Sequence, residues 1–358
     1  MQMAEILSAL RYRVPFHVMK DILTSKKQLT GNGWDATIDK LIKANKTEGN
    51  IENTCEFLFE FYMDHLLYGE KLVRFYTKER KIVNKFADVL KKIEPESSIY
   101  GAAYPLPLSD SELRGLDVDG NPYLVDVSED TKPLTLVFCA TKFYAEKVKL
   151  SVSDLSKKAQ LEYDNYDEIL AVKYNPRQVF DVVTVNPITS QINILIDYSY
   201  GFSEKTFQQR FKKIVTALND LAAVNGINLN LKMSEAINLF SSIDNLYESS
   251  EGRICELAFT TNEGSIKHEK MRRNDLDLRG ETYHKAGKEA VGEIVPYKLG
   301  LCWKVKFNAG LNSTPELFLP GNFRMLSSSK QSLKDAIITK NCGKKDYTFT
   351  IKKLLSNL

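Results

Sequence analysis

The spacing of apolar residues changes sharply between residues 93 and 112. Before that point they recur every three or four positions, as in the stripe from Cys55 to Leu67, and this spacing predicts amphipathic helices. After it the spacing becomes two or continuous, which predicts strands. We therefore expect an α+β protein, with a helical N-terminal bundle followed by a mixed, largely antiparallel β-sheet region with packed helices.

Residues 96–111 separate these two regions and are predicted to form an exposed connector. They contain Pro105 and Pro107, and Pro95 directly precedes them. Proline lacks the backbone N–H that a helix or a buried ladder requires. A chain of 358 residues also exceeds the usual size of one hydrophobic core. The expected division is a helical domain over 1–95, the connector, an α/β domain over 112–248, and a β-rich region over 253–358 that forms its own domain or extends the same sheet.

The clearest hairpin joins residues 179–185 to residues 191–197. Both segments are rich in β-branched residues, and the turn between them contains Asn, Pro and Ser. We expect Ile192, Ile194 and Ile196 to face the core, which would place Asp181 and Asp197 together on the opposite face.

Local signals predict further elements. Ser203 can cap a helix that runs to Gly226, the residue type that often follows a helix end. Turns are expected at Asp119–Gly120 and at residues 262–264, the second within a hairpin. Residues 234–247 are expected to be helical. Other segments whose composition favours strands are residues 134–140, 169–174, 227–231, 297–307 and 347–351.

Overall composition does not identify a partner. The 49 Lys and Arg residues nearly balance the 46 Asp and Glu residues, which leaves a formal charge of +3. The five cysteines are scattered without a C-x-x-C spacing, which favours reduced thiols and a cytoplasmic location. The N-terminus shows no signal-peptide pattern and no apolar stretch is long enough to cross a bilayer, so no contact with a membrane is expected.

Residues 267–288 concentrate basic side chains and form the expected nucleic-acid-binding segment. Arginines and lysines beside the aromatic Tyr283 suit contact with phosphates and occasional stacking on a base. Four acidic residues lie in the same stretch, so a solvated hairpin tip held by ion pairs is an equally good interpretation. The expected phosphate-binding residues are Lys267, Lys270, Arg272, Arg273, Arg279, Lys285 and Lys288.

Asp181 and Asp197 supply the alternative site. Two carboxylates across a hairpin could share a divalent cation, as in a nuclease. No completing acidic-x-lysine signature follows them. The four histidines also lack the spacing of a zinc site, and no nucleotide-binding or acyl-transfer motif occurs, so no metal or cofactor is expected.

The sequence therefore favours a protein without catalytic activity of its own that forms complexes. It would contact the phosphates of DNA or RNA through residues 267–288 and a protein partner through its helical N-terminal domain. One alternative is a metal-dependent nuclease using Asp181 and Asp197, such as an effector in bacterial antiviral defence against phage. Another is a structural scaffold whose basic residues only keep it soluble.

Overall fold

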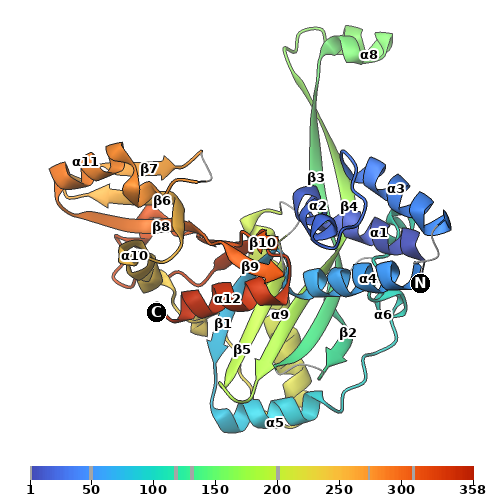
Figure 1. Ribbon diagram of the computed structural model, residues 1–358, viewed down its shortest axis with the longest axis horizontal. Helices are drawn as coiled ribbons and strands as arrows, with labels where there is room; N and C mark the ends of the chain where they lie inside the picture. The colour runs from blue at the N-terminus through green and yellow to red at the C-terminus, as the bar shows by residue number, and fades with distance from the viewer. Residues whose placement is uncertain are drawn as a thin grey trace.

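The computed structural model describes residues 2–47, 51–116, 120–129, 133–198, 202–272, 275–308 and 311–358. Within them, ten strands form one sheet in the order β2-β3-β4-β5-β1-β12-β11-β8-β6-β7, with every neighbouring pair antiparallel (Figure 1). Two further short strands, β9 and β10, pair with each other. The α+β class expected from the sequence is confirmed.

The strands are β1 (Lys71–Thr77), β2 (Tyr123–Ser128), β3 (Leu134–Leu150), β4 (Ile169–Asn186), β5 (Gln191–Asp197), β6 (Arg253–Thr261), β7 (Ile266–Lys270), β8 (Ile294–Cys302), β9 (Val305–Asn308), β10 (Leu311–Ser313), β11 (Glu316–Leu319) and β12 (Ala336–Thr339). The helices are α1 (Met3–Arg13), α2 (Phe16–Ser25), α3 (Trp34–Thr47), α4 (Ile51–Tyr68), α5 (Arg80–Leu90), α6 (Ile99–Ala103), α7 (Asp110–Gly115), α8 (Lys157–Glu162), α9 (Glu204–Val224), α10 (Phe240–Glu248), α11 (Thr282–Val291) and α12 (Lys344–Leu355).

Strand β1 lies near the middle of the sheet, between β5 and β12. It falls inside the segment that was expected to be entirely helical, so that expectation is wrong for these residues. Six of its seven residues are buried, and the run is short and starts two residues after Gly69, which suits a central strand better than a helix. The N-terminal region therefore contributes a strand to the sheet as well as a group of helices.

Helices cover both faces of the sheet. Helices α5 and α9 pack with Leu136, Val183 and Ile194 in one core cluster. On the opposite face, α1, α2 and α4 pack with Val137 and Phe180. A third cluster joins α10 and α12 to β6, β8 and β11. The alternation of Leu136 and Val137 between two clusters is the period-two pattern of a strand that is buried on both faces.

Helix α9 and the hairpin of β6 and β7 confirm the local predictions. The Ser203 side chain accepts a hydrogen bond from the backbone N–H of Thr206, which caps α9 as expected. Gly226 follows the helix with a φ of +69°, a left-handed conformation that glycine adopts without strain. The hairpin turn at residues 262–264 includes Gly264, whose φ is +78°.

The proline-rich segment is more than a bare connector. It contains the short helix α6, and Tyr100 and Leu108 are buried within the N-terminal core cluster. The Leu108 backbone N–H donates to Gln178 Oε1 over 2.8 Å, and the Tyr100 hydroxyl bonds the Thr141 hydroxyl over 2.8 Å. These contacts anchor the segment on β3 and β4, so its expected exposure is wrong at these two residues.

Two expected strands are also corrected. Residues 347–351 belong to α12, where Asp346, Tyr347, Thr350 and Leu354 are buried at helical spacing. Residues 227–231 are irregular, although Ile227, Leu229 and Leu231 contribute to the core. The expected helix over 234–247 begins only at Phe240. The expected turn at Asp119 lies outside the described residues.

Candidate functional site

Strands β3 and β4 form one long hairpin that projects from the body of the protein. Their pairing runs without interruption from Leu134 opposite Val185 to Leu150 opposite Ile169. Neighbouring strands pair only with the inner part, because β2 pairs with residues 135–139 and β5 with residues 182–186. Figure 1 shows the outer part standing clear of the sheet, with α8 at its end. We call residues 143–150 and 169–176 the stem and residues 151–168 the tip.

One face of the stem is apolar and exposed. Residues that are directly opposite in an antiparallel pair project to the same face, and the register places four such pairs on this face. The pairs are Phe143 with Pro176, Ala145 with Tyr174, Lys147 with Val172, and Lys149 with Leu170. Pro176 is buried at the base of the stem, so the exposed part of this face begins at Phe143 and Tyr174. The exposed fractions are 49% for Phe143, 65% for Tyr174, 43% for Val172 and 50% for Leu170. The face holds two lysines and no acidic residue.

The tip also exposes apolar side chains, but its net charge is negative, whereas the net charge of the stem is positive. Leu161 is 82% exposed, and the exposed rings of Tyr163 and Tyr166 meet edge to face with centroids 5.9 Å apart. The tip carries five acidic residues and two lysines, whereas the stem carries three lysines and one glutamate. The acidic residues of the tip are Asp154, Glu162, Asp164, Asp167 and Glu168.

Such exposure is unusual for a two-stranded ribbon. An isolated hairpin is marginally stable in water, and contiguous exposed apolar residues mark interaction sites. The stem was missed at the sequence level because β3 was expected to end at Ala140. The period-two alternation of Leu170, Val172 and Tyr174 was visible, but the sequence does not say which strands lack a covering layer. The stem and the tip together are the strongest candidate for a binding surface.

The expected phosphate-binding segment lies at the other end of the strand order, on β7, α11 and the loop between them. Some residues of this segment have a structural role. Arg279 pairs with Asp277 over 2.7 Å and donates to the backbone carbonyls of Ser249 and Gly252, so it holds a loop together. His284 is buried, with Nε2 3.0 Å from the Tyr247 hydroxyl and Nδ1 2.6 Å from Glu269.

Acidic neighbours neutralise two further members of this segment. Glu256 pairs with Lys270 over 3.0 Å, and Glu248 pairs with Lys288 over 3.0 Å. The remaining basic residues of the segment that the structure describes are exposed and form no ion pair with the described acids: Lys267, Arg272 and Lys285. Arg273 lies outside the described residues. The structure therefore retains fewer phosphate-binding candidates than the sequence indicated.

Asp181 and Asp197 lie on opposite faces of the sheet. The pairing of Val182 with Leu195 and of Val183 with Ile194 places Asp181 on the face of the isoleucines, one residue away from the expected register. Arg210 of α9 binds the Asp181 carboxylate through Nε and Nη2. On the other face, Arg13 of α1 binds Asp197 with two hydrogen bonds of 2.8 and 3.0 Å. The two carboxylates therefore cannot hold a cation between them, which corrects the nuclease alternative.

The charges around Asp197 form a buried network. Lys71 Nζ lies 3.9 Å from Asp197 and donates to the Phe180 carbonyl over 3.2 Å. Burial alone would raise the pKa of Asp197, but the charges of Arg13 and Lys71 outweigh it and hold the pKa below its usual range. Burial lowers the pKa of Lys71 to about 8. These groups stabilise the junction of α1, β1 and β5 and are closed to a ligand.

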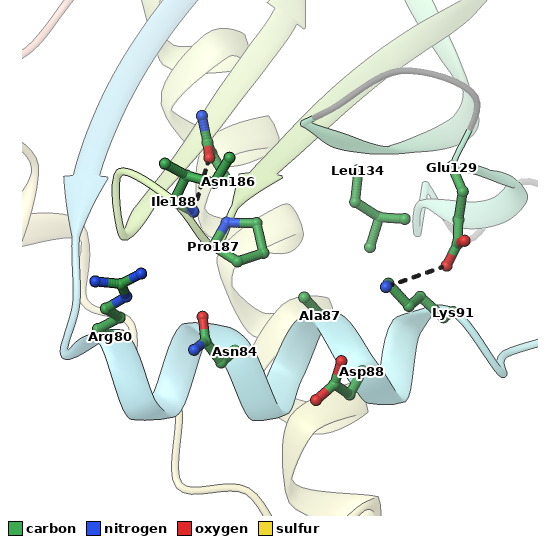
Figure 2. A pocket seen from close by; sticks show the side chains of 10 residues that line it. All are labelled: Arg80, Asn84, Ala87, Asp88, Lys91, Glu129, Leu134, Asn186, Pro187 and Ile188. Atoms are coloured by element: carbon green, nitrogen blue, oxygen red, sulfur yellow. Dashed lines mark hydrogen bonds and ion pairs between the residues drawn. The ribbon is translucent and has the colours of Figure 1, made fainter.

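A surface hollow of about 390 Å³ lies between α5 and the turn that joins β4 to β5. Figure 2 shows Arg80, Asn84 and Ala87 of α5 below Pro187 and Ile188, with Lys91 and Glu129 at one end of the hollow. Lys91 Nζ lies 3.9 Å from Glu129 Oε1. None of the described residues that line the hollow is a histidine, cysteine or serine, and the ionisable ones are Arg80, Asp88, Lys91 and Glu129.

No helix within the described ranges has the length and apolar character needed to span a bilayer. No known family model matches the sequence, and no curated protein is significantly similar to it. The function must therefore be argued from the surfaces of this chain.

Proposed function

We propose that the protein is a complex-forming protein without catalytic activity of its own, and that its β3–β4 stem and tip pair with those of a second copy. The observation that carries the proposal is the exposed apolar face of the stem. Burial of these exposed side chains in an interface is favourable, and full burial of one aliphatic side chain contributes about 1.5 to 3 kcal/mol. The side chains concerned are those of Phe143, Leu170, Val172 and Tyr174. Such a face is stabilised when another surface covers it.

The charges favour a second copy as the covering surface. Two stems related by a twofold axis and running in opposite directions would place each lysine-bearing stem against the acidic tip of the other chain. Lys147 and Lys149 would then lie near acids such as Glu162 and Asp164, with Lys149 also paired to Glu168 of its own tip over 2.9 Å. The exposed Leu161 and Tyr166 would pack on the apolar face. Complementary charge would set the direction of pairing, and apolar burial would supply most of the affinity.

The N-terminal helices are a weaker choice for the protein contact that the sequence suggested. Leu7, Leu10, Val18, Ile22 and Leu58 are buried in the core cluster that these helices form with the sheet. Their apolar side chains are thus already covered within the chain. We therefore place the contact on the stem and tip.

Sedimentation equilibrium of the purified protein tests this proposal. We expect reversible dimers, and we expect Leu170→Ser combined with Tyr174→Ser to weaken the dimer about tenfold or more. A matched control is Val224→Ser, because Val224 is exposed at the end of α9, away from the stem. A monomer at all concentrations, or equal dimer affinity for the variant and the control, would contradict the proposal.

Binding of nucleic acid is a second candidate, and one observation favours it. Lys267, Arg272 and Lys285 are exposed without an acidic partner among the described residues, and Tyr283 beside them is also exposed. If these three cations contact phosphates, the logarithm of the affinity for duplex DNA falls with the logarithm of salt concentration at a slope of roughly −3. Replacing Lys267 and Lys285 with alanine should then reduce the slope by about two. Absence of binding at low salt, or an unchanged slope, would rule this candidate out.

A further inference from the structure

Three potential metal ligands converge from three neighbouring strands at the far end of the sheet from the stem. Cys255 lies on β6, Cys302 on β8 and Glu316 on β11. Their sulfur and carboxylate atoms all lie within 4.8 Å of one another. Because the two cysteines lie 47 positions apart in the sequence, no ligand spacing revealed the group, and no metal was expected.

The strand register creates this convergence. Cys302 pairs with both Arg253 and Glu316, which places the thiol and the carboxylate on the same face. Ile254 of β6 pairs with Leu301 and Glu256 pairs with Gly300, so Cys255 lies at an irregularity between these two pairs. Such irregularities re-aim side chains in sheets. A Cβ atom on Gly300 would lie only 3.3 Å from the Cys255 sulfur, so glycine leaves room for the thiol.

Hydrogen bonds already join two of the three ligands. The Cys302 thiol donates to Glu316 Oε1 over 3.1 Å, and Lys340 Nζ donates to the same oxygen over 2.7 Å. The thiol and the carboxylate are therefore directed toward one point between β8 and β11.

The group is accessible from solvent. Cys302 and Glu316 line a surface hollow of about 330 Å³, together with Arg253, Trp303 and Lys340. A cation could therefore enter, and a water molecule could occupy a fourth position on the open side. This resembles the three protein ligands and one open position found in accessible zinc sites.

We propose that Cys255, Cys302 and Glu316 bind a single thiophilic divalent cation of the zinc type. Zinc is bound by sulfur at about 2.3 Å and by carboxylate oxygen at about 2.0 to 2.2 Å, and a tetrahedron of these dimensions separates its ligands by about 3.4 to 3.8 Å. That spacing falls within the 4.8 Å limit of the group. The bound ion would tie β6, β8 and β11 together and thereby stabilise this half of the sheet.

Titration of the reduced, full-length protein with Co²⁺ tests the site, because two cobalt–thiolate bonds give a charge-transfer absorption in the near ultraviolet. We expect this absorption to saturate at one equivalent and to disappear when Zn²⁺ is added in competition. Cys255→Ser and Cys302→Ser should each weaken binding about a hundredfold or more, and Glu316→Gln less. Cys55→Ser is the matched control, since Cys55 lies on α4, outside the group.

A readout of stability keeps the test independent of folding defects. We expect Zn²⁺ to raise the Tm of the wild-type protein and of Cys55→Ser, but not that of Cys255→Ser, while the three proteins unfold at similar temperatures without metal. The proposal is overturned if the wild-type protein shows no cobalt–thiolate absorption, or if Cys255→Ser binds Co²⁺ as well as Cys55→Ser does.

Discussion

The inner and outer halves of the β3–β4 hairpin share one continuous ladder but lie in opposite environments. In the inner half, Val137 and Val183 are buried beneath helices on both faces of the sheet, and Asp181 is neutralised by Arg210. In the outer half, Val172 and Tyr174 continue the same pairing with no layer over them. Strand pairing therefore does not determine burial. The covering helices do, and beyond the end of these helices the apolar side chains of the hairpin are exposed.

The largest expected effect concerns the buried charges of β1 and β5, which lie beside the inner half and contact it through the Phe180 carbonyl. Asp197→Asn removes the carboxylate that binds Arg13 and lies 3.9 Å from Lys71, so both buried cations lose the attraction of this charge. We expect the free energy of unfolding to fall by about 3 to 5 kcal/mol, measured by urea denaturation.

A matched substitution in the same network distinguishes this cause from a packing defect. Lys71→Met removes one of the two cations while Asp197 keeps its two hydrogen bonds to Arg13. We expect a much smaller loss or a slight gain, because a buried ammonium is exchanged for an apolar side chain of similar length. Equal losses of unfolding free energy in the two variants would show that charge balance does not stabilise this junction.

His65 makes the core next to the inner half sensitive to acid. It is fully buried on α4, and burial lowers the pKa of its imidazole from 6.5 to about 3. The pKa of His65 is lower in the folded than in the unfolded state. The contribution of His65 to the free energy of unfolding is therefore fully present above pH 6.5 and is lost progressively as the pH falls toward 3. At pH 4 we expect the free energy of unfolding to be about 3 kcal/mol lower than at neutral pH because of this group.

Replacing His65 with leucine tests this pH dependence. We expect the unfolding free energy of His65→Leu to fall less steeply between pH 6.5 and pH 4 than that of the wild-type protein. Its value at neutral pH serves as the reference for each protein, so that any packing change cancels. Parallel pH profiles for the two proteins would be inconsistent with a neutral buried imidazole.

Paired valine truncations compare the two halves most simply. Val183→Ala in the inner half should lower the unfolding free energy by about 2 kcal/mol, because it opens a cavity in a packed core. Val172→Ala in the stem should change it by less than about 0.5 kcal/mol at concentrations where the protein is monomeric. If Val172→Ala costs as much as Val183→Ala in the monomer, the stem side chain is covered within its own chain.

The parts of the fold that the sequence predicted are those where one local signal dominates. The Ser203 cap, the helical apolar stripe after it and Gly226 together defined α9 correctly. The β6–β7 hairpin followed from two strand-like runs around a glycine turn. Strand β1 escaped notice because its short apolar run lies between helical patterns, and only its partners β5 and β12 show that it is a strand.

The candidate sites depended on features that a single sequence does not contain. A shift of one residue in the register separated Asp181 from Asp197, since each such shift moves a side chain to the other face. The same sensitivity brought Cys255 to Cys302 through an irregularity in β6. Arg279 was expected to contact phosphates, but its backbone partners come from a distant segment, and only the packing shows which cations remain for a ligand.

Charge reversal in the stem and the tip tests the central claim most directly. One variant carries Lys147→Glu and Lys149→Glu in the stem, and the other carries Glu162→Lys and Asp164→Lys in the tip. In an antiparallel pair of stems, each variant repels its own copies, whereas a stem of the first attracts a tip of the second. Sedimentation velocity should therefore show each variant alone as a weaker dimer than the wild-type protein, and an equimolar mixture should recover dimers. If the mixture remains as dissociated as its components, or if both variants dimerise like the wild-type protein, the stem and tip do not pair with a second copy.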